Sequence, residues 1–153
     1  MRDILPLMIE KADPDKTNEM NEIAELWLKT NLTGQDFIPE TYWKSRFEDV
    51  KKMLPEADIY VFKEKSKIYG FIGIVENRYV AGLFTDYKSQ GKGIGKSLIE
   101  FCQKEYDYLE LDVYVKNIRA VSFYLKNGFV IDFEKTDDET NEREYRMSWK
   151  KEK

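Results

Sequence analysis

Hydrophobic and polar positions alternate along the chain in a way that separates short strands from amphipathic helices. Residues 4–12 form an apolar run that predicts a first strand, in which Pro6 favours a sheet edge or a bulge. A first helix is indicated next by five hydrophobic residues at three- and four-residue spacings: Met20, Ile23, Ala24, Trp27 and Leu28. A loop is predicted over 30–39 and a second helix over 39–53, with Pro39 in the first turn of that helix.

The rest of the chain reads as strands interrupted by two helices. One helix follows a glycine-rich stretch and ends near Glu105, and a shorter one spans 117–126 and stops at an Asn-Gly pair. Strands are predicted over 58–63, 68–75, 78–85, 109–115, 129–136 and 143–149, with hairpins joining the first two and the last two. This order predicts a single α/β domain over 1–153, built on a mixed, mostly antiparallel sheet with helices on both faces.

Composition narrows the class of protein further. A chain of 153 residues with 42% hydrophobic and 35% charged residues is typical of one globular domain. The net charge of −4 argues against a broad nucleic-acid surface, and no apolar run is long enough to span a membrane. Cys102 is the single cysteine, so we expect no internal disulfide and a cytoplasmic location. The absence of histidine excludes His-based triads and metal sites, and no metal is expected.

The stretch SQGKGIGKSL, residues 89–98, is typical of a phosphate-binding loop before a helix. An NTPase P-loop would need a glycine where the chain has Gln90, and a later magnesium-binding Asp is not evident. A Rossmann loop would need a glycine in place of Lys96 and would follow the first strand. Both are therefore disfavoured, whereas a plain glycine-rich turn stays open from these residues alone.

Gln90, Gly93 and Gly95 fit a third pattern, Q/R-x-x-G-x-G/A, in register. Here the chain resembles the GNAT superfamily of N-acetyltransferases, in which this motif closes the fourth strand and holds the pyrophosphate of acetyl-CoA on backbone N–H groups. A helix N-terminus suits that role because it presents unpaired donors and a partial positive charge. The resemblance implies a phosphate site made by Gln90, Gly91, Lys92, Gly93, Ile94, Gly95 and Lys96.

A second motif supports the resemblance. NIRAVSFYLKNGF, residues 117–129, fits N-x-x-A-x-x-x-Y-x-x-x-G-F at the spacing of the family. Asn117, Ala120 and Tyr124 share one helix face. The resemblance implies that Asn117 bonds the pantetheine arm, that Ala120 leaves room for it, and that Tyr124 is the general acid for the departing thiolate. From the residues alone, Asn117 could equally be a helix cap and Tyr124 a packing residue.

The resemblance also places the strand around residues 79–86 beside the cofactor. In the family this strand and the one after the next helix splay apart, and the pantetheine arm pairs with the exposed backbone edge. Leu83, Phe84 and Thr85 occupy the matching positions, where an N–H group would face the thioester oxygen. The chain departs from the family at Tyr87 and Ser89, which changes the stiffness of the loop but removes no phosphate donor.

The acceptor side is less determined. The resemblance assigns it to the loop between the first two helices and to the final hairpin, where an acidic and aromatic rim would suit a cationic amine. A solvated turn is the simpler interpretation of the hairpin acids. Glu110 and Asp112 are expected to be structural charges, so no general base is assigned, and Cys102 is expected to be a buried thiol. The candidates are Asp36, Phe37, Tyr42 and Trp43 in the loop region and Asp137, Asp138 and Glu139 in the hairpin.

The sequence therefore predicts an acetyl-CoA-dependent N-acetyltransferase that acts on a primary amine. The acceptor could be a small molecule, a peptide N-terminus or a protein lysine, and the expected partners are acetyl-CoA and that amine, with neither nucleic acid nor membrane. A non-catalytic acyl-CoA-binding or regulatory domain of the same fold is the alternative. The oligomeric state and the preferred acyl-chain length stay open.

Overall fold

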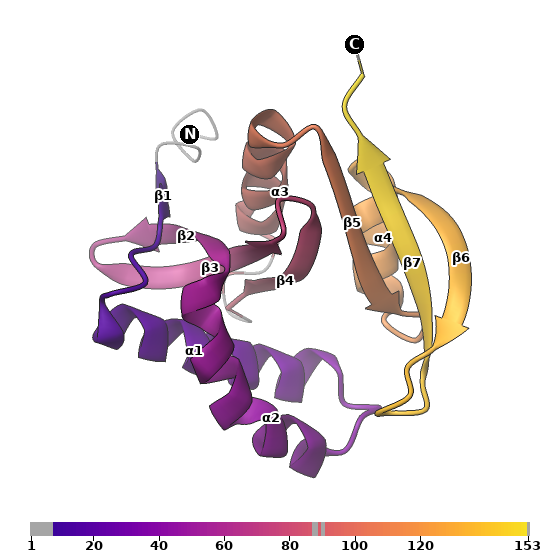
Figure 1. The fold of residues 1–153 in the computed structure, drawn as a ribbon, viewed down its shortest axis with the longest axis horizontal. Coiled ribbons are helices and arrows are strands. Elements are labelled where there is room, and N and C mark those ends of the chain that lie inside the picture. The colour runs from indigo at the N-terminus through magenta and orange to yellow at the C-terminus, as the bar shows by residue number, and fades with distance from the viewer. Residues whose placement is uncertain (1–7, 87–88, 90, 153) are drawn as a thin grey trace.

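The computed structural model describes residues 8–86, 89 and 91–152. In this part of the chain a seven-stranded sheet has the order β1-β2-β3-β4-β5-β7-β6 (Figure 1). Neighbouring strands pair antiparallel except β4 and β5, which are parallel, so the predicted sheet class is confirmed. The strands are β1 (Ile9–Lys11), β2 (Asp58–Glu64), β3 (Lys67–Val75), β4 (Tyr79–Thr85), β5 (Tyr108–Tyr114), β6 (Val130–Thr136) and β7 (Arg143–Lys150).

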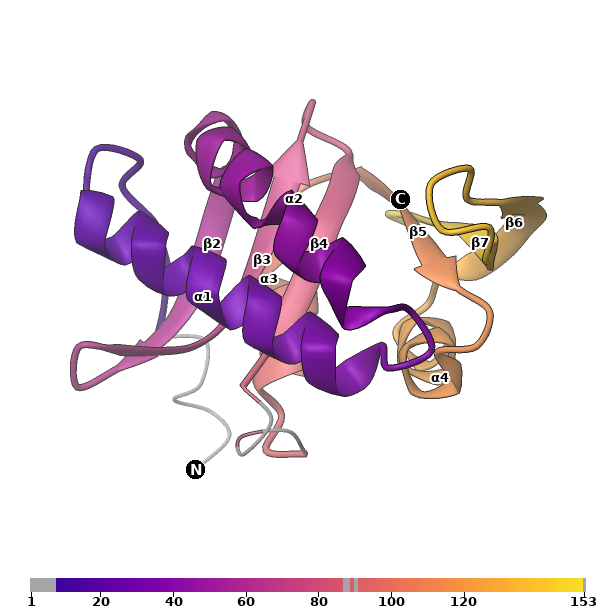
Figure 2. The same ribbon diagram turned by 90° about the horizontal axis from the view of Figure 1, so that it is seen from below.

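The described residues form four α-helices that cover both faces of the sheet. Figure 2 shows α1 and α2 in front of β2 to β4, with α3 behind them. The helices are α1 (Thr17–Gly34), α2 (Glu40–Met53), α3 (Ile94–Glu105) and α4 (Ile118–Lys126), and a short 3-10 helix η2 (Leu54–Glu56) follows α2. In the part of the chain that the structure describes, no helix is both long and apolar enough to cross a membrane.

Two hydrophobic cores lie on opposite faces of the sheet. On one face, Ile72 and Leu98 are fully buried in a cluster that joins the central strands to α3 and α4. On the other face, Ile23 and Phe71 belong to a cluster under α1 and α2. Neighbouring residues of β3 thus enter different cores, which explains why this strand is hydrophobic at nearly every position.

Two elements differ from their predicted bounds. The helix α1 continues to Gly34, whereas the sequence predicted a loop from residue 30. Thr30 and Asn31 are buried within the helix, where the Thr30 hydroxyl donates to the Leu26 carbonyl at 2.8 Å and the Asn31 amide donates to the Trp27 carbonyl at 2.9 Å. These bonds satisfy the buried side-chain donors without ending the helix. Among the described residues the first strand covers Ile9–Lys11 and lies at the sheet edge, while the predicted residues 4–7, Pro6 included, are outside the described part of the chain.

The strands β4 and β5 separate soon after they meet. Among the described residues their pairing is confined to Tyr79 and Glu110. Two residues further along β4, Ala81 is an extra residue opposite β3, because Gly73 pairs with Gly82 while Ile74 pairs with Val80. Such a bulge bends a strand and increases its twist. The bulge therefore accounts for the divergence of β4 from β5, which the resemblance had implied (Figure 1).

Candidate active site

The glycine loop leads directly into the N-terminus of α3. Gly91 and Gly93 both have φ of 85°, a conformation that other residues rarely adopt, and Gly93 is the residue before the helix. No side chain of the described residues caps this end, so the first-turn N–H groups stay available to an anion. Lys92 and Lys96 are exposed beside it, and Gln90 lies outside the described residues. The loop thus has the backbone geometry that a phosphate site requires.

The start of α3, the end of β4 and the middle of α4 come together. A Cβ atom placed on Gly95 would lie 3.6 Å from the Thr85 hydroxyl oxygen and 3.6 Å from the ring of Phe123. The residues predicted to bind the cofactor on β4 and on the glycine loop are therefore neighbours. On β4, Leu83 packs toward the core under α3, whereas Phe84 packs against Phe71 on the other face, with ring centroids 5.3 Å apart.

Asn117 is the N-cap of α4, which confirms the simpler interpretation of this residue. Its side-chain oxygen accepts a hydrogen bond from the Ala120 N–H at 3.1 Å. Its amide nitrogen donates to the Gln35 side chain at 3.3 Å, and Gln35 in turn donates to Asn31 at 3.3 Å. These bonds link the end of α1 to the start of α4, and they already occupy both polar atoms of Asn117.

Tyr124 lies on the inner side of α4 and is 8% exposed. Its ring packs edge-on against Phe123 and Phe129, with centroids 5.4 and 5.5 Å away. Burial raises the pKa of the phenol well above its ordinary value, so the hydroxyl keeps its proton at neutral pH. The described residues offer the hydroxyl no hydrogen-bond partner, which leaves its proton free to donate to a bound group.

The opposite face of β5 carries a network centred on Arg146 of β7. The guanidinium donates to Glu110 at 2.6 Å and to Asp112 at 2.7 and 3.1 Å. Asp112 also accepts from the Tyr79 hydroxyl at 2.8 Å and pairs with Lys135 at 3.1 Å. The prediction that Glu110 and Asp112 are structural charges is therefore confirmed, as is the burial of Cys102, which has no exposed surface.

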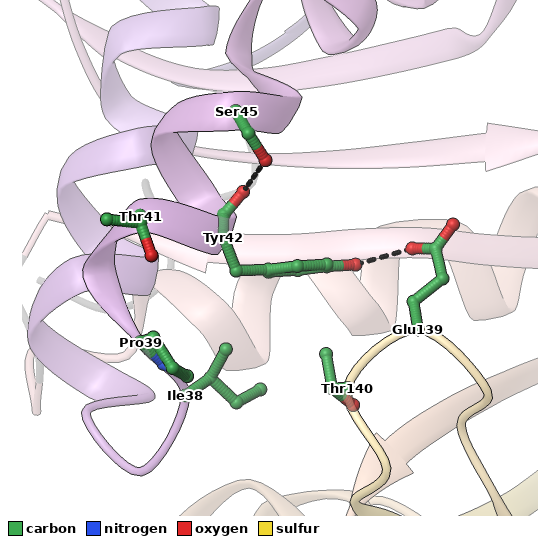
Figure 3. A pocket seen from close by; sticks show the side chains of 7 residues that line it. All are labelled: Ile38, Pro39, Thr41, Tyr42, Ser45, Glu139 and Thr140. Carbon is green, nitrogen blue, oxygen red and sulfur yellow. Dashed lines mark hydrogen bonds between the residues drawn. The ribbon is translucent and has the colours of Figure 1, made fainter.

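The α1–α2 loop and the β6–β7 hairpin meet on this same face, as the resemblance implied for the acceptor side. The Tyr42 hydroxyl donates to Glu139 at 2.7 Å, beside an open pocket of about 320 Å³ (Figure 3). Phe37 packs edge-on against Tyr114, with centroids 5.6 Å apart. The lining residues are Ile38, Pro39, Thr41, Tyr42, Ser45, Glu139 and Thr140.

The other acceptor candidates have different surroundings. Trp43 is 7% exposed and packs against Trp27, with centroids 5.9 Å apart, while Asp36 is exposed on the loop. Asp137 accepts hydrogen bonds from the Tyr114 hydroxyl, the Glu139 N–H and the Thr140 hydroxyl at 2.7 to 3.0 Å. The hairpin is thus held by Asp137 rather than being only a solvated turn.

A family model described as the acetyltransferase (GNAT) domain matches residues 20–150. The chain belongs to the GNAT acetyltransferase family. It is an N-acetyltransferase that depends on acetyl-CoA, as the sequence predicted. The alternative of a non-catalytic acyl-CoA-binding domain is disfavoured, because curated relatives of this chain are named as enzymes.

The chain is also similar over nearly its whole length to named enzymes and to solved structures. The acetyltransferase is 37% identical over 143 residues to the peptidyl-lysine N-acetyltransferase YiaC of Escherichia coli K12, covering 93% of this chain and 96% of that protein. The solution structure of apo YjaB from Escherichia coli superposes with a TM-score of 0.79 at 25% identity, covering 92% of this chain and 95% of that one. The PaiA N-acetyltransferase of Thermoplasma acidophilum, solved with coenzyme A, shares the fold, with a TM-score of 0.72, 22% identity and coverage of 94% and 99%.

Two features of the structure were not predicted from the sequence. The bulge at Ala81 was not predicted, although a glycine inside a strand, here Gly82, often marks a bulge. Glu144 of β7 was not singled out either. Burial, together with Asp137 and Asp112, raises the pKa of Glu144 to about 7. Its position in a polar strand pattern is no different from that of an ordinary surface acid.

Proposed function

We propose that this acetyltransferase transfers the acetyl group of acetyl-CoA to the side-chain amine of a lysine in a protein or peptide. The observation that carries the proposal is the nearly full-length similarity to YiaC, a peptidyl-lysine N-acetyltransferase, at 37% identity. The acceptor side adds support, because Glu139 beside Tyr42 presents an acidic and aromatic rim, which suits a cationic side chain.

We propose that acetyl-CoA is held by backbone groups on two elements. The uncapped start of α3 would bind the phosphates, and the β4 edge at Leu83, Phe84 and Thr85, which lies beyond the Tyr79–Glu110 pair where β4 diverges from β5, would bind the pantetheine arm. Ala120 would border the arm from α4. Asn117 would act mainly by fixing α4, because its amide is already bonded to Ala120 and Gln35. The phosphate-binding residues proposed are Gln90, Gly91, Lys92, Gly93, Ile94, Gly95 and Lys96.

Tyr124 is the proposed general acid for the coenzyme A thiolate. A phenol whose pKa is raised by burial is protonated when the C–S bond breaks, and the thiolate is a strong acceptor for its proton. Support comes from the 8% exposure of Tyr124 and from the lack of a competing partner for its hydroxyl in the described residues.

Tyr124→Phe tests this role. The variant keeps the ring packing and loses only the hydroxyl, so kcat should fall by about 100-fold while the Kd for coenzyme A stays within about twofold. The matched control is Tyr145→Phe, since Tyr145 packs against the same core and should tolerate the change without loss of kcat. An unchanged kcat in Tyr124→Phe would remove the hydroxyl from the mechanism.

The acceptor class is tested with three amines in a thiol-release assay. These are a peptide with one lysine and a blocked N-terminus, a lysine-free peptide with a free N-terminus, and a small diamine. We expect the highest kcat/KM for the lysine peptide, with the acetylated lysine located by mass spectrometry. A higher kcat/KM for either other amine would refute the lysine proposal while leaving the acetyltransferase activity established.

We also propose that residues 1–153 act as one domain in the cytoplasm. The domain bounds are supported by the family match over 20–150 and by the single sheet that joins β1 to β6. The cytoplasmic location stays a prediction from the sequence. Fractionation of cells that express the untagged protein would test it.

A further inference from the structure

We propose that Glu144 is the general base that accepts a proton from the acceptor amine. The proposal rests on the proposed transfer to an amine at the splayed strands, and it assigns the role that the sequence left open. Three features of Glu144 support this role: its level in the sheet, the face of the sheet to which it belongs and, among the described residues, its lack of a competing partner.

Strand register puts Glu144 level with the predicted thioester position. The strands β4 and β5 are parallel and pair at Tyr79 and Glu110. Because Ala81 is an extra residue on β4, Phe84, five residues beyond Tyr79, is level across the splay with Tyr114, four residues beyond Glu110. Tyr114 pairs directly with Glu144 on β7. Phe84 is one of the residues whose N–H group would face the thioester oxygen. Glu144 is therefore in the row of the sheet that borders the reacting carbonyl.

Glu144 and Tyr124 belong to opposite faces of the sheet. Met147 of β7 lies in the core cluster that also contains Tyr124, and Tyr145 packs against that cluster. Because strand residues alternate in direction, Glu144 and Arg146 face the other way, and Arg146 indeed bonds Asp112 there. An amine that enters from the acceptor side would meet Glu144, while the thiolate would leave toward Tyr124.

The other carboxylates near this row already have partners. Asp112 and Glu110 bind the Arg146 guanidinium, and Asp137 accepts three hydrogen bonds within the hairpin. Among the described residues, Glu144 has neither a hydrogen bond nor an ion pair, and its side chain is only partly exposed. It is thus the carboxylate of this face whose lone pairs are free to accept a proton.

The surroundings of Glu144 also suit proton transfer near neutral pH. Burial and the charges of Asp137 and Asp112 raise its pKa to about 7, and Lys135 and Arg146 oppose the rise but are themselves bonded to Asp112. A base is most effective when its pKa lies near the working pH. The titratable groups that face Glu144 are Tyr79 of β4, Asp112 and Tyr114 of β5, Lys135 of β6, Asp137 of the hairpin turn and Arg146 of β7.

The proton balance of the transfer closes with these two residues. Glu144 takes one proton from the ammonium group, and the nitrogen lone pair then forms the C–N bond with the acetyl carbon. The C–S bond breaks, and Tyr124 donates its proton to the sulfur. The second proton of the nitrogen returns to the Tyr124 oxygen as the amide forms. Glu144 finally releases its proton to water, so the net products are the amide, coenzyme A thiol and one proton.

Glu144→Gln tests the proposal through the pH profile. We expect kcat/KM of the wild type to fall about tenfold per pH unit below about pH 7, because protonated Glu144 cannot act as a base. In Glu144→Gln, kcat at pH 7 should fall by about 100-fold with the Kd for coenzyme A unchanged. The break near pH 7 should disappear, leaving a kcat/KM that rises steadily toward the pKa of the amine, about 10.4, because only the free amine then reacts. Glu142→Gln is the matched control, since Glu142 lies in the same hairpin and pairs with Lys116 at the surface, and its profile should equal that of the wild type.

A second variant separates catalysis from packing. Glu144→Ala opens space for a small carboxylate, and added formate should restore part of kcat in this variant but not in Glu144→Gln. A lower kcat with an unchanged acidic limb and no rescue would make Glu144 a packing residue and overturn the proposal. The profile is measured with whichever amine is acetylated fastest, so failure of the lysine proposal would not be mistaken for failure of Glu144.

Discussion

Replacing Arg146 should destabilise the fold far more than replacing Arg143, although both arginines are on β7 and both bind acids. Arg146 makes hydrogen bonds of 2.6, 2.7 and 3.1 Å to Glu110 and Asp112. Those two carboxylates have only 11% and 13% of their side chains exposed. Arg146→Met keeps most of the side-chain volume but leaves two poorly solvated negative charges without their shared cation.

The magnitude follows from burial and from the remaining partners. Removing one member of a buried ion pair costs about 3–5 kcal/mol. Here the loss should be about 2–3 kcal/mol, because Arg146 is 25% exposed and Lys135 still pairs with Asp112. For a domain of this size that corresponds to a fall in Tm of roughly 4–12 °C. Arg143→Met breaks a 2.6 Å pair with Glu134 in which the side chains are 52% and 41% exposed, so about 0–1 kcal/mol is expected.

Urea denaturation of the wild type and both variants at pH 7 measures the free energies of unfolding. A second series toward low pH adds a sign test. Burial opposes ionisation of Asp112, but hydrogen bonds from Arg146, Tyr79 and Lys135 hold its pKa below the usual value. A lowered pKa in the folded state stabilises the protein above the usual pKa of an Asp side chain and stops doing so as the pH falls. The gap between wild type and Arg146→Met should therefore narrow below about pH 4. Equal losses for the two variants at pH 7 would refute the reasoning.

Two further predictions concern the core and the contact between α1 and α4. Burial raises the pKa of the Cys102 thiol to about 12, so a disulfide reagent at pH 8 should label the native protein no faster than it unfolds; rapid labelling would show that the thiol is accessible. Asn117→Ala should cost about 1–2 kcal/mol in urea denaturation because it removes the α4 cap and the bond to Gln35, whereas Asn117→Ser should recover most of that loss; equal stability of the two variants would contradict the capping role.

Local chemistry explains which parts of the fold could be predicted. The strands and helices follow the hydrophobic periodicity, and the glycine loop was predictable because Gly91 and Gly93 supply a backbone geometry that few residues adopt. The predicted end of α1 was wrong because Thr30 and Asn31, judged from their intrinsic preferences alone, disfavour a helix. Here their side chains bond helix carbonyls in a buried setting that a single sequence does not reveal.

Long-range contacts explain what was missed at the site. Tyr42 and Glu139 are 97 positions apart, and their contact depends on how the hairpin crosses toward α2. Glu144 could be assigned to a polar face from the alternation around Met147, but its level relative to Phe84 depends on the pairing of three strands and on the bulge at Ala81. Its lack of a partner follows from Arg146 and Lys135 both binding Asp112, which is a property of the assembled sheet.

The extra residue Ala81 determines to which face of the sheet each later side chain of β4 points. Val80 and Leu83, three positions apart, both contact the core under α3, while Phe84 enters the core under α1. In a regular strand Leu83 would share the side of Ala81 instead. A deletion here would exchange inward and outward side chains across Leu83, Phe84 and Thr85, even though every remaining residue is unchanged. Length at this point of the chain is therefore constrained more tightly than residue type, and natural or engineered indels should be tolerated in the polar hairpin turns rather than here.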